Sequence, residues 1–535
     1  TNFDPLELKE NYIIHNRAEG EQKIRLKPVK NDKEAFRRLI DKDDELIEKS
    51  NITKNYRYFF NKIEKSKVSP DDLYSAIEKL IIVNITLSTV DDDPQLIFES
   101  LNSTGMSLSQ SDLVRNYILM KETSQVQNIY YETYWNKIEI NTLYKVDSFI
   151  RDYLTYKTNI IPNKGNVYFS FKEYVENLKK DNSFDMNIFL QELLKFSSYY
   201  KTIITAESNN LKIEELLKEI YRLDITVSYP YLLETLDLLG NNKITQKQFI
   251  EILEIIVSYI FRRTICDLPT NSLNKIFMVL GKDIKKHLKD NCFDDYSYYV
   301  EILKYILLHK KYTQRYPDDN EFRSKLNEKD IYNLQSKSKI HLLTLLENYN
   351  NNEKVDVEKL LDEKKLSIEH VMPQTLSIKW KKDLGEDYET IHQKYLHKLG
   401  NLTLSAYNKE LSNKPFVNKK DDEHGFNDSK LYLNSYIKQV DTWNKKEIKE
   451  RAKILTDKAL QIWYYPITTY KPSNEKDFED NKYSLEEDFD VTGTKIYQFE
   501  FMKELVSVDS WKDFAKKVLL ILYDLDSQII SEIAH

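Results

Sequence analysis

The spacing of apolar residues predicts helices along most of the chain. Ser69 and Pro70 suit the first positions of a helix, and the apolar residues that follow within 71–81 lie along one helical face. Similar amphipathic stretches, rich in Tyr and Phe and without a repeat of fixed period, cover residues 125–345. We therefore expect a mainly α fold in which this helical layer supports and spaces the ends of the molecule.

Two short stretches instead indicate β-structure. The apolar run Leu366–Val371 reads as a strand that Pro373 ends, because proline cannot continue a sheet ladder. About thirty residues later, a tight turn at Gly400–Asn401 precedes a short strand over Leu402–Leu404. A helix should then begin around residues 405–408. Strand, turn, strand and helix in this order predict a small ββα-metal arrangement.

Two further segments have patterns of their own. Residues 93–120 read as a helix, a turn at Asn102–Gly105, a serine-rich cap at Ser109–Ser111 and a second helix. From spacing alone, the turn is a helix C-cap. Near the end of the chain, alternation over 496–501 suits a strand, and Ser510 with Asp513 resembles a capping box before a helix. We expect this tail to be a compact α+β module without a visible site.

Composition and charge narrow the class of protein. The 535 residues are 41% hydrophobic and 31% charged, which indicates several globular domains. Cys266 and Cys292 cannot form a disulfide framework, and the sequence has neither a long apolar run nor a secretory signal. We therefore predict a soluble, cytoplasmic protein that does not enter a membrane. The sequence begins abruptly with a helix-like pattern, so we expect the chain to be a piece of a longer protein.

The net charge hides a local excess of positive charge. The whole sequence carries −7, but residues 364–460 contain 19 Lys and Arg against 14 Asp and Glu, a balance of 19 − 14 = +5. This excess supports a nucleic-acid site there without being sufficient evidence for one. Elsewhere, Arg262 and Arg263 could contact phosphate, although paired arginines more often bridge acidic helix faces.

The stretch from Leu366 to Lys420 carries the candidate chemistry. Glu369 and His370 are neighbours on the predicted strand, so they point to opposite sides of it and would do different jobs. Phosphodiester hydrolysis needs a proton acceptor for water and a cation for the added negative charge; a histidine and one hard divalent ion held by oxygen ligands can provide them. A lone histidine before a proline turn, however, is more often structural than catalytic.

Zinc is the competing interpretation of this stretch. Four of the nine histidines, His370, His392, His397 and His424, fall within it. No cysteine accompanies them, and their spacing matches no zinc site. We therefore treat the last three as ordinary surface or loop histidines.

The same stretch resembles the HNH-type nuclease domain of the GmrSD family of modification-dependent (type IV) restriction enzymes. That family has the pattern I-E-H-I-x-P-Q, then W, L-G-N-L-T-L, N and K. The residues that match it here are Ile368, Glu369, His370, Pro373, Gln374, Trp380, Leu399, Gly400, Asn401, Leu402, Thr403, Leu404, Asn408, Asn413 and Lys419 or Lys420, with Trp443, Arg451 and Trp463 in the closing helix.

A second motif resembles the N-terminal nucleotide-hydrolysing domain of the same family. Its pattern, F-E-x-x-N-x-x-G-x-x-L-x-x-x-D-L-x-x-N, is matched by Phe98, Glu99, Asn102, Gly105, Leu108, Asp112, Leu113 and Asn116. The family's nucleotide-binding motif D-G-Q-Q-R is absent from this sequence. NTP could therefore be a cofactor only if an upstream segment or a separate N-terminal or NTPase subunit supplies that motif.

The resemblance implies a role for each matched residue of the nuclease stretch. His370 would be the general base, and Asn401 would brace the loop and orient it. Glu369 and Asn408 would hold Mg²⁺ or Mn²⁺. The DNA backbone would be contacted by four lysines, Lys409, Lys414, Lys419 and Lys420.

The resemblance therefore predicts a metal-dependent endonuclease of bacterial anti-phage defence that cuts foreign, modified DNA. Alternatives are a non-catalytic DNA-sensing or scaffold subunit and an RNA-cleaving HNH toxin, and oligomerisation is left open. Four domains are expected, namely the remainder of the nucleotide-hydrolysing domain at 1–124, a helical middle domain at 125–350, an HNH-like nuclease domain at 351–466 and the small α+β module at 467–535.

Overall fold

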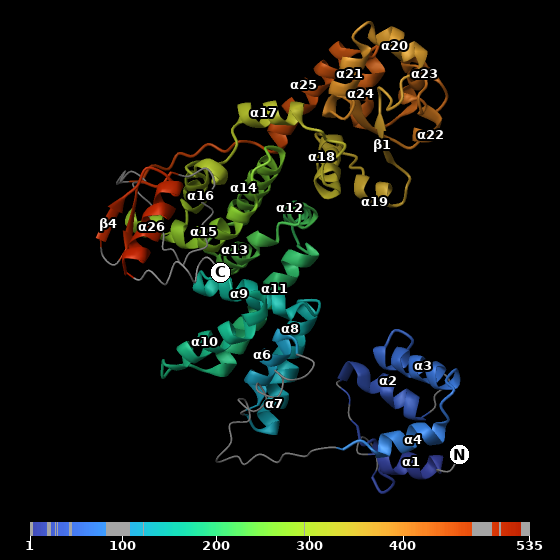
Figure 1. Cartoon of the computed structure of the whole chain (residues 1–535), viewed down its shortest axis with the longest axis vertical. Coiled ribbons are helices and arrows are strands. Elements are labelled where there is room, and N and C mark those ends of the chain that lie inside the picture. Colours follow the sequence, from blue (N-terminus) through green and yellow to red (C-terminus); the bar gives the residue numbers. More distant parts are fainter. Residues whose placement is uncertain are drawn as a thin grey trace. The chain divides into compact units, whose positions relative to one another are not determined.

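The chain is mainly helical and falls into two compact units, Thr1–Pro94 and Gln95–His535 (Figure 1). The computed structural model describes residues 4–18, 23–26, 28, 30–41, 45–81, 108–120, 122–293, 295–472, 495–501 and 504–525. The predicted domain boundaries at 124, 350 and 466 stay predictions.

The first unit contains four described helices, α1 (Pro5–Tyr12), α2 (Lys30–Asp41), α3 (Asn51–Glu64) and α4 (Pro70–Glu78). The predicted start of α4 is confirmed, since the Ser69 hydroxyl accepts a hydrogen bond from the backbone N–H of Asp72 (3.1 Å) and Pro70 is the first helical residue. Ser50 caps α3 in a similar way, through the N–H of Ile52 (3.2 Å).

A long series of helices opens the second unit and confirms the mainly α prediction. Among the described residues up to 348, its α-helices are α6 (Gln110–Leu119), α7 (Ser124–Tyr130), α8 (Asn136–Asn141), α9 (Val146–Thr158), α10 (Val167–Lys179), α11 (Met186–Thr205), α12 (Leu211–Arg222), α13 (Tyr229–Gly240), α14 (Gln246–Ile265), α15 (Asn271–Asp290), α16 (Tyr299–Leu308), α17 (Asp319–Glu328) and α18 (Ser336–Asn348).

Amphipathic spacing explains why these segments are helical. In α12, the buried residues Ile213, Leu216, Leu217 and Ile220 recur at intervals of three, one and three, which places them on one face. A complete capping box between Thr245 and Gln248 starts α14. Together the helices enclose one large apolar core.

The paired arginines of α14 are structural, so the phosphate interpretation of them is wrong. Arg262 and Arg263 are 0% and 1% exposed. Arg262 donates to the carbonyl of Trp463 (2.6 Å) and to the carboxylate of Asp319 (2.6 Å), and Arg263 donates to the carbonyl of Thr313 (2.6 Å). Both guanidinium groups are engaged in hydrogen bonds that hold loops against the core, so neither is available to a phosphate.

The next section contains two short strands where the sequence predicts them, while the ββα-metal arrangement itself stays a prediction. Its elements are α19 (Val357–Asp362), β1 (Ser367–His370), α20 (Ile378–Leu384), α21 (Tyr388–Tyr395), the 3₁₀ turn η6 (Leu399–Asn401), β2 (Leu402–Ser405), α22 (Asn408–Leu411), α23 (Phe416–Asp421), the 3₁₀ turns η7 (Phe426–Asp428) and η8 (Tyr432–Asn434), α24 (Ser435–Gln439) and α25 (Lys445–Ile462).

The two-stranded sheet of β1 and β2 contributes to two apolar cores. Leu402 and Leu404 of β2 belong to the large core of the helical series. Val371 and Met372, which directly follow β1, belong to a second core that also contains Trp380. Because the two strands share their hydrogen-bond ladder, packing in either core fixes the position of both.

The last described segment is a hairpin and a helix. β3 (Gln498–Phe501) pairs antiparallel with β4 (Glu504–Ser507), and α26 (Trp511–Leu525) follows. The predicted strand and helix are confirmed, and the Ser510 hydroxyl accepts from the N–H of Asp513 (3.2 Å). The sequence did not predict β4. Within the ranges given above, no helix is long and apolar enough to span a membrane.

Candidate active site

The candidate site begins at two adjacent residues at the end of β1. In the antiparallel ladder with β2, Glu369 lies opposite Thr403 and His370 lies opposite Leu402. Both are almost buried, with 4% of each residue exposed. Glu369 contacts α23, whereas His370 contacts the segment before η6. The two side chains therefore meet different neighbours, as strand geometry requires.

Asn401 braces the turn that follows His370. Its amide nitrogen donates to the carbonyls of Met372 (3.0 Å) and Leu396 (2.9 Å). Its amide oxygen accepts from the Met372 backbone N–H (2.8 Å) and from the Trp443 indole N–H (3.1 Å). These four hydrogen bonds use the full capacity of a buried asparagine. The role of orienting His370, which the resemblance implies for Asn401, stays a prediction.

Arg451 of α25 holds the 3₁₀ turn η6, which contains Asn401. One of its terminal nitrogens donates to the carbonyls of Leu399 (3.2 Å), Gly400 (2.8 Å) and Leu402 (2.8 Å). Burial lowers the pKa of Arg451 to about 9. The contact is so close that a Cβ at Gly400 would lie 2.2 Å from the carbonyl oxygen of Ile448. Only glycine fits there, which gives the L-G-N motif a packing reason.

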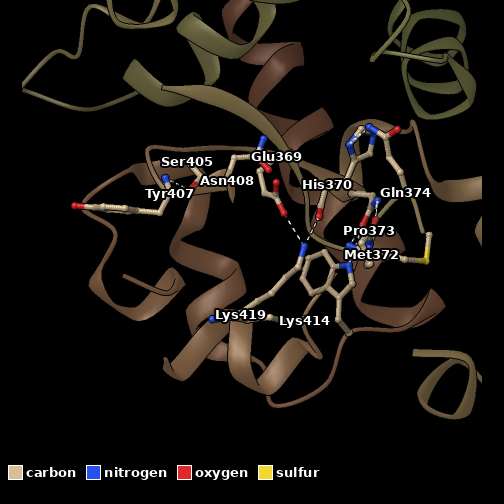
Figure 2. A network of polar contacts seen from close by, with 12 residues as sticks. Glu369, His370, Met372, Pro373, Gln374, Ser405, Tyr407, Asn408, Lys414 and Lys419 are labelled. Carbon is tan, nitrogen blue, oxygen red and sulfur yellow. Dashed lines mark hydrogen bonds and ion pairs between the residues drawn. The ribbon is translucent and has the colours of Figure 1, made fainter. Parts of the chain in front are cut away.

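Glu369 forms a buried ion pair with Lys419 of α23. The Lys419 ammonium lies 2.6 Å from one carboxylate oxygen of Glu369 and donates to the carbonyl of His370 (2.9 Å), as Figure 2 shows. Burial raises the pKa of the Glu369 carboxyl and lowers the pKa of the Lys419 ammonium, in both cases against the attraction of the partner.

The position of Lys419 corrects one prediction. Its side chain is 0% exposed, so its ammonium does not lie on a surface that a DNA backbone could contact. Phe416 on the same helix packs in the second core, which turns Lys419 inward. The sequence pattern of adjacent lysines could not reveal which of the two faces the interior.

His370 lies in a cluster of side chains from three segments. Its Nε2 is 3.1 Å from Nδ1 of His397, and its Nδ1 is 3.3 Å from the amide nitrogen of Gln374. The ring of Tyr332 lies 4.5 Å from the His370 ring, centroid to centroid. Burial, followed by the nearby charges of His397 and Lys419, lowers the pKa of His370 to about 4.

This cluster contains two residues that the sequence interpretation missed. His397 is a direct neighbour of His370 and not an ordinary loop histidine. Tyr332 precedes α18, outside the predicted nuclease range 351–466. For His397 the signal was present, because it stands four residues before Asn401. No feature of the sequence singled out Tyr332.

The other two histidines of this section have separate surroundings. Nε2 of His392 contacts the carbonyl of Pro373 (2.9 Å). It also lines an open depression of about 480 Å³ that includes Gln374 and Tyr388. His424 is exposed and stacks on Tyr407, with ring centroids 4.3 Å apart.

Asn408 opens α22, close to Glu369. Its amide nitrogen donates to the carbonyl of Ile368 (3.2 Å), one residue before Glu369. The described contacts leave the amide oxygen of Asn408 for another partner. Figure 2 draws the side chains of Asn408 and Glu369 in one view. A carboxylate and an amide oxygen are hard ligands of the kind that Mg²⁺ or Mn²⁺ takes. One oxygen of the Glu369 carboxylate is paired with the Lys419 ammonium, and ion binding by Glu369 and Asn408 stays a prediction. Among the described residues, no three His, Cys, Asp or Glu side chains gather as a metal cluster.

The remaining predicted DNA-binding lysines are more accessible than Lys419. Lys409 is exposed on α22. Lys414 is 43% exposed and pairs with Asp422 (2.9 Å). Lys420 is 13% exposed and lies 3.1 Å from Asp441. Lys409 is therefore the lysine that the structure leaves most open to a phosphate.

The second predicted motif is described only in part. Glu99, Asn102 and Gly105 lie outside the described residues. Asp112 and Asn116 both lie on α6, where Asp112 accepts from the hydroxyl of the N-cap Ser109 (2.6 Å) and pairs with Arg115 (2.7 Å). These contacts of Asp112 stabilise the start of the helix.

Two protein-family models match the chain. The model described as GmrSD restriction endonuclease, N-terminal domain, matches residues 6–119, and the model described as GmrSD restriction endonucleases, C-terminal domain, matches residues 316–458. A search of curated proteins finds no match. The first match contains the whole 98–116 motif. The second contains all the site residues above, including Tyr332. The chain belongs to the GmrSD family of type IV restriction enzymes.

Proposed function

We propose that this restriction nuclease is a metal-dependent DNA endonuclease that hydrolyses phosphodiester bonds in foreign, modified DNA during bacterial anti-phage defence. The observation that carries the proposal is the arrangement of Glu369 and His370 at the end of β1, with Asn408 at the start of the helix after β2. Strand, strand and helix with these three residues suit an HNH-type ββα-metal nuclease.

In the proposed reaction, His370 takes a proton from water. Its lowered pKa keeps the imidazole neutral and able to accept at neutral pH. Because Nε2 is engaged by His397, the proton goes to Nδ1, where the water replaces the amide of Gln374. The water oxygen forms a bond to phosphorus while the bond from phosphorus to the 3′-oxygen breaks. The 3′-oxygen leaves with the electron pair and is protonated by solvent.

Glu369 and Asn408 are the proposed holders of the divalent ion. When bound, Mg²⁺ or Mn²⁺ would neutralise charge on the phosphoryl oxygens and on the departing 3′-oxygen. The amide nitrogen of Asn408 donates to the carbonyl of Ile368, and the amide oxygen is the atom that would bind the ion. Asn401 maintains the turn that orients His370.

DNA binding is assigned to the exposed positive charge near the site. Lys409 is the first candidate, and Lys414 and Lys420 are further candidates. Such contacts position a duplex without reading its sequence. Recognition of the DNA modification would involve other parts of the assembly. The same holds for any use of NTP, which would need a supplied D-G-Q-Q-R motif or a separate subunit.

Plasmid nicking tests the proposal. The protein is incubated with supercoiled plasmid DNA and Mg²⁺ or Mn²⁺, beside His370→Ala and a control, His309→Ala, which removes an exposed histidine after α16. We expect nicking by the unchanged protein and by the control, and loss of nicking in His370→Ala. Equal cleavage by all three would refute the role of His370. Cleavage of RNA alone would indicate the toxin alternative, and binding without any cleavage the scaffold alternative.

A further inference from the structure

Three aromatic rings lie together at the candidate base. His370 and His397 have ring centroids 5.2 Å apart at an angle of 72°, and their ring nitrogens Nε2 and Nδ1 lie 3.1 Å apart. Tyr332 stacks on His397 with 15° between the planes and a centroid distance of 5.3 Å. His370 thus has an imidazole partner, and the Tyr332 ring contacts both imidazoles, with its centroid 4.5 Å from that of His370.

Backbone hydrogen bonds hold His397 in addition to the contact between its ring and Tyr332. Its carbonyl accepts from the N–H of Ile331 (2.9 Å) and from the N–H of Tyr332 (3.4 Å). The next residue, Lys398, donates its ammonium to the carbonyl of Glu328. The end of α17 and the segment that follows it therefore hold residues 397 and 398 at several points, while the His397 ring contacts Tyr332 and His370.

The contacts at the two ring nitrogens suit one tautomer of His370. The amide nitrogen of Gln374 can only donate, so Nδ1 of His370 accepts there. A neutral imidazole with a lone pair on Nδ1 carries its proton on Nε2. That proton points at Nδ1 of His397, which accepts it. His397 therefore favours the tautomer that leaves Nδ1 free for a proton from water.

We infer that His397 is a positioning residue for His370, and that Tyr332 sets the plane of the His397 ring. The inference rests on the proposed function, since it concerns how His370 serves as the base. His397 touches neither the substrate nor the metal in this scheme. It acts by holding one tautomer and one ring orientation, so its loss should lower the rate of the chemical step more than the binding of DNA.

Steady-state kinetics on a plasmid substrate test the inference with two substitutions at His397. His397→Ala removes the acceptor, whereas His397→Asn keeps an amide group near the position of Nδ1. We expect His397→Ala to lower kcat by about 10- to 100-fold with KM changed by less than about 3-fold, and His397→Asn to recover most of the rate. Tyr332→Ala should lower kcat in the same sense, and Tyr332→Phe, which keeps the ring, should not.

The controls separate this inference from the proposed function. Thermal unfolding of each variant, and DNA affinity measured in EDTA, show whether the fold and binding persist. Full activity of His397→Ala beside an inactive His370→Ala would overturn the positioning role and leave the proposed function intact. Equal loss of kcat in His397→Ala and His397→Asn would also overturn it, because the acceptor at Nδ1 would then be irrelevant. Activity of His370→Ala would instead refute the proposed function.

Discussion

Replacing Lys419 by methionine separates a structural role from a DNA-binding role. The ammonium is fully buried between Glu369 and the carbonyl of His370. Methionine has a similar volume but no charge, so Lys419→Met leaves the Glu369 carboxylate buried without its partner. Breaking one side of a buried ion pair costs about 3–5 kcal/mol. We expect a loss of unfolding free energy of that size.

A double-mutant cycle isolates the pair itself. Glu369→Gln alone should also destabilise the protein, because it leaves the Lys419 charge without its carboxylate partner. In Glu369→Gln combined with Lys419→Met, neither buried charge remains, so the double variant should lose less than the sum of the two single losses by about 2 kcal/mol or more. Urea unfolding followed by tryptophan fluorescence measures this, since Trp380 and Trp443 lie in the second core together with Phe416 of α23.

Lys409 provides the matched control on DNA binding. It is exposed on α22, so Lys409→Met should leave the urea midpoint unchanged. If Lys409 meets a phosphate, its removal lowers the slope of log affinity against log salt concentration by about 1. Lys419→Met should leave that slope unchanged. A normal urea midpoint together with a reduced salt slope in Lys419→Met would refute the burial argument and return Lys419 to the DNA-binding set.

Three further expectations follow from the same structure. Asn401→Ala removes four buried hydrogen bonds and should cost about 3–5 kcal/mol in urea unfolding, with loss of nicking; a change below about 1 kcal/mol would contradict the bracing role. Burial lowers the pKa of His341 to about 3, so the unfolded chain binds a proton below pH 6.5 that the folded chain does not. The free energy of unfolding should therefore fall by about 2 kcal/mol from pH 6.5 to 5, and continue to fall toward pH 3, relative to that of His341→Leu. Urea unfolding at each pH measures this difference, and parallel curves for the two proteins would argue against it. EDTA should abolish nicking by the unchanged protein and excess Mg²⁺ or Mn²⁺ should restore it, whereas undiminished nicking in EDTA would exclude the divalent ion.

The sequence allowed prediction of the elements whose causes are local. The Ser69–Pro70 start of α4 depends on residues within one turn, and the strand near Leu366 depends on a short apolar run and the proline after it. The adjacent Glu369 and His370 were assigned to opposite sides by strand geometry alone. In each case the deciding contacts are close in sequence.

The features that could not be predicted depend on contacts between distant residues. Whether Lys419 or Lys420 faces inward depends on how α23 lies against β1, a packing across 50 residues of sequence. Tyr332 reaches His370 only because the loop before α18 bonds to His397. β4 was missed because its four residues offer little more than one apolar pair between polar neighbours.

The helical series and the site section are joined at the site itself, which has a consequence for how His370 is held. Glu347 of α18, 0% exposed, accepts from the backbone N–H groups of Tyr432 (2.7 Å) and Leu433 (2.9 Å). The next residue, Asn434, accepts from the hydroxyl of Thr403 (2.5 Å), the residue that lies opposite Glu369 on β2.

One set of contacts therefore runs from α18 through η8 to β2, and a second runs from the loop before α18 through His397 to His370. Both begin before residue 351, so a segment limited to 351–466 would contain the proposed ligands and the proposed base but neither of these supports. The match of the C-terminal family model from residue 316 includes both. The part of the chain that orients the proposed base, His370, is thus larger than the motif that contains it. The pair of strands β1 and β2 is too short to hold a buried histidine in one orientation by itself.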